Sequence, residues 1–453
     1  MNKRYVALLI GDAFCAATAM LAAFLLRFWE IPGMESISGT HGVRLVLFVF
    51  VMLFCAFFVE LYSQERELST QELAGRVLIE LVLALFLLTS LYYFLPVVMY
   101  GRGVLVLSLI VFGLFQFLWH AGSRGGFIFP TFAKRVLILG TGPLASQMGT
   151  LISASGQRYV LSGYVSCPRE PVYVPAHSIV GNEEGLYETV CRAGAHKIVV
   201  SLGERRGVFP VKDVLSCKLS GVEVLDAPSF YERVTGKLLI ESINPSWLIF
   251  SSGFRVTAIN RIIKRLMDIS CAILGGFLTL PFLPFVALAI RLDSPGPILF
   301  RQERVGEREK SFNLYKFRTM RVDAEKGTGA VWAQKDDPRV TRLGRFLRKS
   351  RIDEIPQLFN VLMGDMSLVG PRPERPEFVE QLKTVIPYYS ERHFVKPGVT
   401  GWAQVRYPYG ASVDDAVEKL RYDLYYIKNL TVAFDLLIIL DTVKVVLFQR
   451  GGR

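Results

Sequence analysis

The chain has 453 residues, of which 51% are hydrophobic, and its mean hydropathy of +0.35 is high for a soluble protein. A formal net charge of +12 suits a surface that faces nucleic acid, anionic lipid or phosphorylated substrates. No nucleic-acid-binding module is recognisable, so we expect no nucleic acid partner and favour membrane lipids and phosphates. The six cysteines form no C-x-x-C pair, which favours reduced thiols over a metal site or a disulfide framework.

Four apolar segments precede residue 121, and each approaches the roughly 20 residues that a membrane-spanning helix needs. They cover about 5–27, 43–62, 74–98 and 102–120. The first contains one acidic residue, Asp12, and its length favours a retained helix over a signal peptide. The bias of Lys and Arg favours both ends of this region inside. We therefore predict that residues 1–121 form four transmembrane helices that anchor the protein and carry no chemistry.

A different pattern begins at Lys134, where an apolar strand leads into Gly140-Thr141-Gly142 and a helix start. Further strands are expected at 159–165 and 196–202, with a helix at 184–193, so 133–255 is interpreted as a Rossmann-like α/β domain. The segment 159–166 lacks the acidic residue that binds ribose, and the chain contains no Tyr-x-x-x-Lys pair. A structural or regulatory domain is favoured, and a bound nucleotide or small ligand is left open.

The apolar run 269–290 carries basic residues on both flanks and contains Pro281 and Pro284. Because basic flanks favour the cytoplasmic side, both ends are expected there, and proline bends a helix. This favours a re-entrant helix that enters one leaflet, kinks near Pro281 and returns, over an ordinary span. The arginines of 339–348 suit contact with lipid headgroups, and a solvated basic face is the alternative. The run 431–448 is expected to be an amphipathic helix that lies on the membrane or packs on the domain.

Two adjacent carboxylates, Asp353 and Glu354, lie just before Pro356, which suits the first turn of a helix. Such a pair beside arginines favours a Mg²⁺ site or a carboxylate nucleophile that forms an acyl phosphate. The alternative is an acidic helix cap. Cations set among glycine and proline in the blocks 315–320, 364–373 and 396–405 suit a clamp on phosphate oxygens, which phosphoryl transfer requires.

From about Ile259 onward, the chain closely resembles the bacterial sugar transferase family, whose members are monotopic polyprenyl-phosphate phosphoglycosyl transferases. The resemblance extends over nearly 200 residues in several ordered motifs. They are Asp293-Ser294-Pro295-Gly296-Pro297, Lys316-Phe317-Arg318, Asp353-Glu354-x-Pro356-Gln357, Gly370-Pro371-Arg372-Pro373, Lys396-Pro397-Gly398-x-Thr400-Gly401-Trp402, and Asp423 with Tyr425 and Tyr426. The first 255 residues are similar in architecture to the extension of the large subfamily.

The resemblance implies a role for each matched position. Asp353 is expected to be the nucleophile and a Mg²⁺ site, and Glu354 is its catalytic partner. Pro281 is expected to break the membrane helix, although Leu280 stands where family members often have serine. The basic residues expected to bind substrate phosphate are Lys316, Arg318, Arg348 and Arg372, with Arg348 near the acceptor phosphate.

The expected fold is a membrane protein with an N-terminal four-helix transmembrane bundle, a Rossmann-like domain at 133–255 and a mostly helical catalytic domain at 259–453. The resemblance implies transfer of a sugar-1-phosphate from a UDP-sugar to undecaprenyl phosphate with release of UMP. This would start exopolysaccharide or O-antigen synthesis at the cytoplasmic face of the bacterial inner membrane. The sugar and a homodimer are left open, and the rival functions are a nucleotide-sugar dehydratase or epimerase and a non-catalytic assembly scaffold.

Overall fold

The chain folds into two compact units, Met1–Gly236 and Lys237–Arg453, and each is described here by itself. The boundary between them falls inside the range 133–255 that was expected for the Rossmann-like domain. The computed structural model describes residues 3–28, 40–59, 61–62, 70–99, 101–125, 134–155, 159–203, 209–243, 245–322, 324, 337–407, 410 and 412–447.

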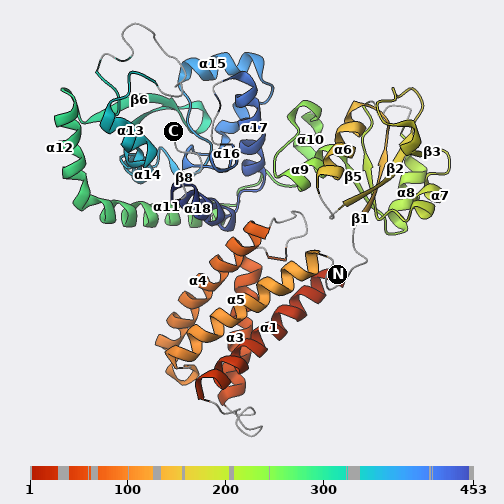
Figure 1. Cartoon of the computed structure of the whole chain (residues 1–453), viewed down its shortest axis with the longest axis horizontal. Coiled ribbons are helices and arrows are strands. Elements are labelled where there is room, and N and C mark those ends of the chain that lie inside the picture. The colour runs from red at the N-terminus through yellow and green to blue at the C-terminus, as the bar shows by residue number, and fades with distance from the viewer. Residues whose placement is uncertain are drawn as a thin grey trace. The chain divides into compact units, whose positions relative to one another are not determined.

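The first unit begins with long apolar helices: α1 (Lys3–Phe28), α3 (Thr40–Phe58), α4 (Thr70–Phe94) and α5 (Arg102–Gly125). A short 3-10 turn, η1 (Pro96–Val98), follows α4. Figure 1 shows the four helices side by side. Ala16, Ala19 and Ala23 of α1 are fully buried. Small residues let apolar helices approach closely. A Cβ atom at Gly11 would lie 2.2 Å from Cε2 of Trp119, so the α1–α5 contact needs glycine there.

The charge that interrupts the first apolar segment is buried among polar side chains. The carboxylate of Asp12 accepts hydrogen bonds from Tyr62 Oη at 2.8 Å and Gln116 Nε2 at 3.2 Å, and lies 3.0 Å from His120 Nε2. Gln116 Nε2 also donates to Glu80 Oε1 at 3.2 Å. A buried charge needs such partners, so this cluster explains how α1 tolerates an aspartate.

A five-stranded parallel sheet follows, in the order β3-β2-β1-β4-β5. The expected strands are present as β2 (Tyr159–Ser166) and β4 (Lys197–Val200), beside β1 (Lys134–Leu139). The strands β3 (Ile179–Asn182) and β5 (Glu223–Asp226) were not predicted. Each has only four residues, all of them at least partly exposed, so neither shows a clear alternation of apolar and polar side chains in the sequence. The connecting helices are α6 (Pro143–Ala154), α7 (Leu186–Ala193), α8 (Val211–Leu219) and α9 (Ala227–Thr235), and η3 (Ala176–Ser178) precedes β3.

The second unit opens with η4 (Ile240–Ser242), α10 (Pro245–Phe250) and the long helix α11 (Ala258–Thr279). The α-helical pattern stops at η5 (Leu280–Phe282), which contains Pro281, and resumes as α12 (Leu283–Asp293). Figure 1 shows α12 turning away from the line of α11. Thr279 Oγ1 donates to the Gly275 carbonyl at 2.7 Å, which satisfies a backbone group next to the break.

Among the described residues, five helical segments are long and apolar enough to cross a membrane, namely α1, α3, α4, α5 and the stretch Ala258–Asp293. Their side chains leave much apolar surface outside the protein interior, most of all in the last stretch. Together with the parallel sheet, this confirms the expected membrane protein with an α/β region.

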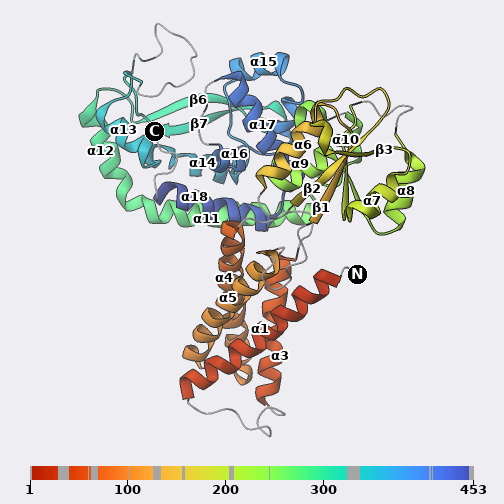
Figure 2. The ribbon, with the colours of Figure 1, turned by 45° about the vertical axis from the view of Figure 1, so that its right-hand side comes forward.

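The rest of the second unit contains the antiparallel hairpin β6 (Leu299–Val305) and β7 (Ser311–Phe317) and the parallel pair β8 (Ser367–Val369) and β9 (Gly398–Thr400). Helix α18 (Val432–Leu447) lies beside α11 in Figure 2, and Asp435 on α18 pairs with Lys264 on α11 at 2.6 Å. This ion pair holds α18 against α11, which explains the presence of Asp435 in the apolar run. The other elements are η6 (Glu307–Glu309), α13 (Arg342–Lys349), η7 (Ile352–Glu354), α14 (Gln357–Met363), α15 (Pro376–Val385), η8 (Ser390–Phe394), α16 (Trp402–Arg406) and α17 (Val413–Lys428).

Candidate active site

A sharp turn between α13 and α14 presents the two carboxylates. Arg351 adopts a left-handed conformation with φ of 60°, which ends α13 and starts the 3-10 turn η7. Asp353 and Glu354 occupy η7 and are only 7% and 8% exposed, and Pro356 then leads into α14. A non-glycine residue at positive φ is held by its surroundings, so the turn fixes the position of both side chains.

Three cations surround Glu354. Its Oε1 atom lies 3.0 Å from Lys316 Nζ and 2.9 Å from Arg372 Nη2, and its Oε2 atom lies 3.2 Å from Arg351 Nη1. Burial opposes ionisation of this carboxyl, but the charges of Lys316, Arg372 and Arg351 outweigh burial and hold the pKa of Glu354 well below its usual range. Glu354 is therefore an ionised anchor for the cations around it.

Asp353 has the opposite environment. Its Oδ1 atom is buried and has no hydrogen-bond partner in the described part of the chain. Burial raises the pKa of Asp353; Lys316 opposes the rise and the charge of Glu354 adds to it. Neighbouring carboxyl groups whose pKa values are driven apart are suited to different chemical roles. Asp353 is thus the carboxylate with an oxygen atom available to react or to bind a ligand.

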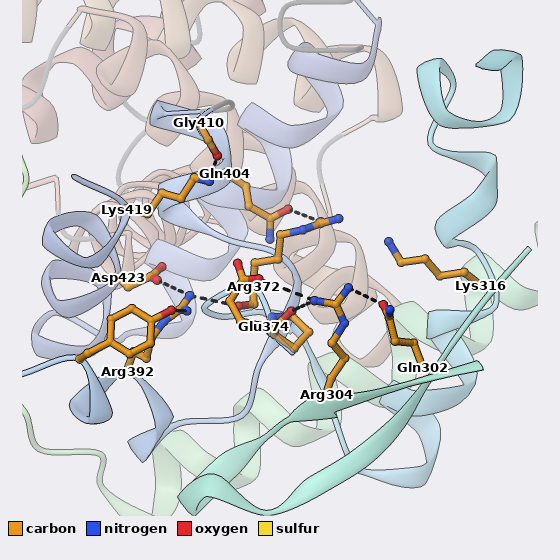
Figure 3. A network of polar contacts seen from close by, with 12 residues as sticks. Gln302, Arg304, Lys316, Arg372, Glu374, Arg392, Gln404, Gly410, Lys419 and Asp423 are labelled. Carbon is orange, nitrogen blue, oxygen red and sulfur yellow. Dashed lines mark hydrogen bonds and ion pairs between the residues drawn. The ribbon is translucent and has the colours of Figure 1, made fainter. Parts of the chain in front are cut away.

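A second layer of contacts holds the Arg372 guanidinium in place (Figure 3). Arg372 Nη1 donates to Gln404 Oε1 at 3.1 Å, and the Arg372 carbonyl oxygen accepts from Arg392 Nη2 at 3.0 Å. Arg392 is buried and pairs with Asp423 at 2.8 Å. Nearby, Arg304 Nη1 donates to the Pro373 carbonyl at 3.0 Å. Two arginines therefore fix the backbone of the loop that carries Arg372, while Gln404 orients its side chain.

The structure brings some of the predicted site residues together and separates others. Lys316 and Arg372 converge on Glu354, whereas Arg348 donates to Thr319 Oγ1 at 2.9 Å and acts on Asp353 through its charge. Arg318 instead donates from Nη1 to the Pro295 carbonyl at 3.0 Å and from Nη2 to Ser294 Oγ at 3.0 Å, so it holds the loop before β6. Pro281 lies in η5, between α11 and α12.

Two residues of the site were not predicted: Arg351, which pairs with Glu354, and Gln404, which accepts a hydrogen bond from Arg372. Arg351 precedes Glu354 by three residues, and this spacing could have indicated an ion pair. Gln404 lies in a matched block, but nothing in its spacing points to Arg372, which is 32 residues away.

The residues around Asp353 suit a metal bound together with substrate. Mg²⁺ is usually held by one or two carboxylates plus phosphate oxygens rather than by a cage of protein ligands. The unpaired, buried Oδ1 atom of Asp353 suits such a ligand. The described residues contain no group of three or more His, Cys, Asp or Glu side chains that could hold a metal ion by themselves.

The glycine turn of the first unit is occupied by a side chain of the same chain. Glu170 Oε2 accepts a hydrogen bond from the backbone N–H of Thr141 at 2.8 Å. Cβ atoms placed at Gly140 and Gly142 would lie 3.0 Å from Glu170 carboxylate oxygens. A dinucleotide phosphate would bind at this turn, at the start of α6. The carboxylate takes that position, which argues against a dehydratase or epimerase that uses this domain.

Comparison with known proteins gives a match to the family model "Bacterial sugar transferase" over residues 259–449. The UDP-N-acetylgalactosamine-undecaprenyl-phosphate N-acetylgalactosaminephosphotransferase of Aeromonas hydrophila is 44% identical over 237 residues, which are 52% of this chain and 55% of that protein. The undecaprenyl-phosphate glucose phosphotransferase of Komagataeibacter xylinus is 36% identical over 332 residues, which are 71% of this chain and 60% of that protein.

A shorter relative is matched over almost its whole length. The exopolysaccharide production protein PSS of Rhizobium leguminosarum bv. phaseoli is 43% identical over 199 residues, which are 42% of this chain and 98% of that protein. The chain therefore spans little more than half of the two longer relatives and nearly all of this one. The family-model match, residues 259–449, includes the dyad and its cations.

Proposed function

Because the chain belongs to the bacterial sugar transferase family, we propose that it transfers a sugar-1-phosphate from a UDP-sugar to undecaprenyl phosphate and releases UMP. The relatives from Aeromonas hydrophila and Komagataeibacter xylinus carry names for this type of reaction, with different sugars. The product would be the first lipid-linked sugar of an exopolysaccharide or O-antigen.

The observation that carries the proposal is the contrast within the dyad. Asp353 keeps a buried, unpaired oxygen atom, while the adjacent Glu354 is ionised and surrounded by Lys316, Arg351 and Arg372. A nucleophile needs a free oxygen, and a diphosphate needs cations that neutralise its charge in the transition state. Both requirements are met around the adjacent residues Asp353 and Glu354.

The proposed reaction has two steps. In the first, an Asp353 carboxylate oxygen attacks the β-phosphorus of the UDP-sugar, the bond to the bridging oxygen breaks, and UMP leaves with that oxygen. In the second, a phosphate oxygen of undecaprenyl phosphate attacks the phosphorus of the resulting acyl phosphate, and the Asp353 carboxylate leaves. One phosphoanhydride is broken and another is formed, so the transfer requires no ATP.

Lys316 and Arg372 would bind the diphosphate of the donor, and Arg348 would bind the acceptor phosphate. Arg318 would act on the donor site through the Ser294–Pro295 backbone that it holds. Mg²⁺ would be held by Asp353 together with substrate phosphate oxygens and would neutralise charge there. Chelation with EDTA should abolish UMP release, and added Mg²⁺ should restore it. Retained release in EDTA, with donor binding measured by calorimetry unchanged, would contradict this part of the proposal.

The membrane arrangement proposed for the chain follows from its apolar helices. The helices α1, α3, α4 and α5 would form a four-helix transmembrane bundle, and the 3-2-1-4-5 strand order supports a Rossmann-like domain after it. The break at Pro281 supports a re-entrant α11–α12 segment. Basic residues on both sides of that segment favour a catalytic domain on the cytoplasmic face of the inner membrane.

The decisive experiment compares Asp353→Asn with the wild type. The variant should release no UMP from any UDP-sugar and should form no covalent phosphosugar adduct, since an amide cannot supply the attacking oxygen. Purified protein would be incubated with a panel of radiolabelled UDP-sugars, which also identifies the sugar. Asp414→Asn, at an exposed position of α17, serves as the matched control and should retain activity. Wild-type turnover in Asp353→Asn would reject the mechanism.

A further inference from the structure

A cavity of about 200 Å³ adjoins the dyad within the second unit. It lies between η7, α14, β9, α16 and α18, and residues from each of these elements line it. Its lining has two parts. Contacts through Glu354 and Arg372 link the charged and amide groups of Arg351, Glu354 and Gln404, here called the polar end, and the aliphatic groups from α14, β9 and α16 are called the apolar end. The change in lining indicates a ligand with one charged end and one apolar end.

The polar end contains Arg351, Glu354 and Gln404. Gln404 Oε1 accepts from Arg372, but its Nε2 atom is buried and has no hydrogen-bond partner in the described part of the chain. A buried amide donor without a partner is costly, and a ligand oxygen would satisfy it. With Arg372 and Arg351 nearby, this end of the cavity suits a phosphate oxygen.

The apolar end is lined by Ile355, Leu358, Val399 and Val405. Two hydroxyl groups also face it, but Thr400 and Thr442 bond to one another at 2.7 Å, and Thr442 Oγ1 donates to the Ile438 carbonyl at 2.7 Å. These hydroxyls are therefore satisfied within the protein. A uracil base or a sugar needs several polar partners, so this end suits a hydrocarbon better than either.

The residues that line the apolar end of the cavity come from elements that pack against the apolar helix α11 or lie beside it. Leu358 and Val399 pack in the core cluster of Ala272 on α11, and Thr442 belongs to α18, which runs beside α11 in Figure 2. Helix α11 leaves most of its apolar side chains outside the protein interior, as a lipid-facing helix does. The apolar end is thus lined by residues that pack against the apolar helix α11 or belong to its neighbour α18.

We propose that this cavity binds the phosphate-proximal isoprene unit of the polyprenyl phosphate acceptor. An apolar cavity of about 150 Å³ binds benzene, so about 200 Å³ holds a five-carbon isoprene unit. The acceptor phosphate then reaches Gln404 and Arg351 at the polar end, beside Glu354, and these two residues would bind it together with Arg348. This assignment rests on the proposed function and adds to it the site at which the lipid acceptor is recognised.

The test fills the cavity in the full-length protein with Val405→Phe. The KM for undecaprenyl phosphate should rise at least tenfold, whereas the single burst of UMP formed without acceptor should change less than twofold. A ten-carbon prenyl phosphate should show the same loss, because the cavity contacts only the first isoprene unit. Val443→Phe on α18 is the matched control, since Val443 is 49% exposed and does not line the cavity, and it should leave both acceptors unaffected.

Several outcomes would overturn the assignment. An unchanged acceptor KM in Val405→Phe would do so, and a slower UMP burst would place the UDP-sugar in the cavity instead. Should Val405→Phe fold poorly, Val405→Ala enlarges the cavity and should weaken acceptor binding about threefold, and unchanged binding would again reject the site. Native mass spectrometry measures undecaprenyl phosphate binding without turnover, so a wild type that forms no UMP would refute the proposed function and still leave the cavity tested.

Discussion

The side chains of Asp353 and Glu354 show how adjacent carboxylates acquire different roles. Both are buried, yet Glu354 contacts three cations and Asp353 keeps one oxygen atom free. The pKa of Glu354 is held low, whereas burial raises the pKa of Asp353. The acid limb of the pH–rate profile should therefore report Asp353, which must lose its proton before it can attack.

This difference predicts the behaviour of Glu354→Gln. The substitution removes a neighbouring negative charge and frees Lys316 and Arg372 to act on Asp353, so the pKa of Asp353 should fall. Because the ionised form of Asp353 reacts, the acid limb of the UMP burst rate should move to lower pH. The plateau rate should fall by about 10²-fold, as expected for loss of a catalytic partner.

The rate of the UMP burst would be measured from low pH to neutrality for both proteins. Glu380→Gln is the matched control, because the Glu380 side chain is 76% exposed and pairs with Lys383, away from the dyad. An acid limb that stays in place or moves to higher pH would show that Glu354 does not influence Asp353.

At the scale of elements, the main feature is the apolar segment α11–η5–α12, which is interrupted in its middle. A straight helix of the 36 residues Ala258–Asp293 would be about 54 Å long, well beyond the roughly 30 Å of a bilayer core. Pro281 removes a backbone donor and interrupts this helix, and Thr279 satisfies carbonyl groups beside the break. The segment can therefore enter and leave on one side.

Replacing Asp293 by Cys in a cysteine-free background tests this topology. The thiol should react with a membrane-impermeant maleimide from the cytoplasmic side only, because Asp293 ends α12, which returns to that side in the proposed re-entrant arrangement. The double change Pro281→Leu and Pro284→Leu should straighten the segment, remove that labelling and abolish transfer. Pro284→Leu alone is the control, since it retains the break at Pro281. Labelling from the periplasmic side in the otherwise unaltered chain would show an ordinary span.

At the scale of the whole molecule, the candidate active site lies entirely within one of the two compact units. The dyad, its cations and the proposed acceptor cavity all lie within Lys237–Arg453. The first unit contributes apolar helices and a sheet whose glycine turn is filled by Glu170. The match to the bacterial sugar transferase family model, residues 259–449, also lies entirely within the second unit.

Residues 237–453 expressed alone in membranes should therefore release UMP from the UDP-sugar used by the full chain. The rate should lie within about tenfold of the full-length rate, because a compact unit with its own core can fold by itself. The assay would quantify UMP per folded protein, with Asp353→Asn in the same fragment as the control. Complete loss of release from a folded fragment would assign a catalytic contribution to the first unit.

The sequence by itself determined the apolar helices, the parallel α/β region, the adjacent carboxylates and the family. These features can be predicted from local composition, hydrophobic periodicity and motif spacing, all of which are properties of the linear sequence. Only the tertiary structure decided which cations reach the dyad, since Lys316 and Arg372 lie 38 and 18 residues from Glu354 in the chain. The tertiary structure also places the Arg318 guanidinium against the Ser294–Pro295 loop and the Glu170 carboxylate at the glycine turn. Such contacts depend on how distant segments pack, and residue spacing does not specify them.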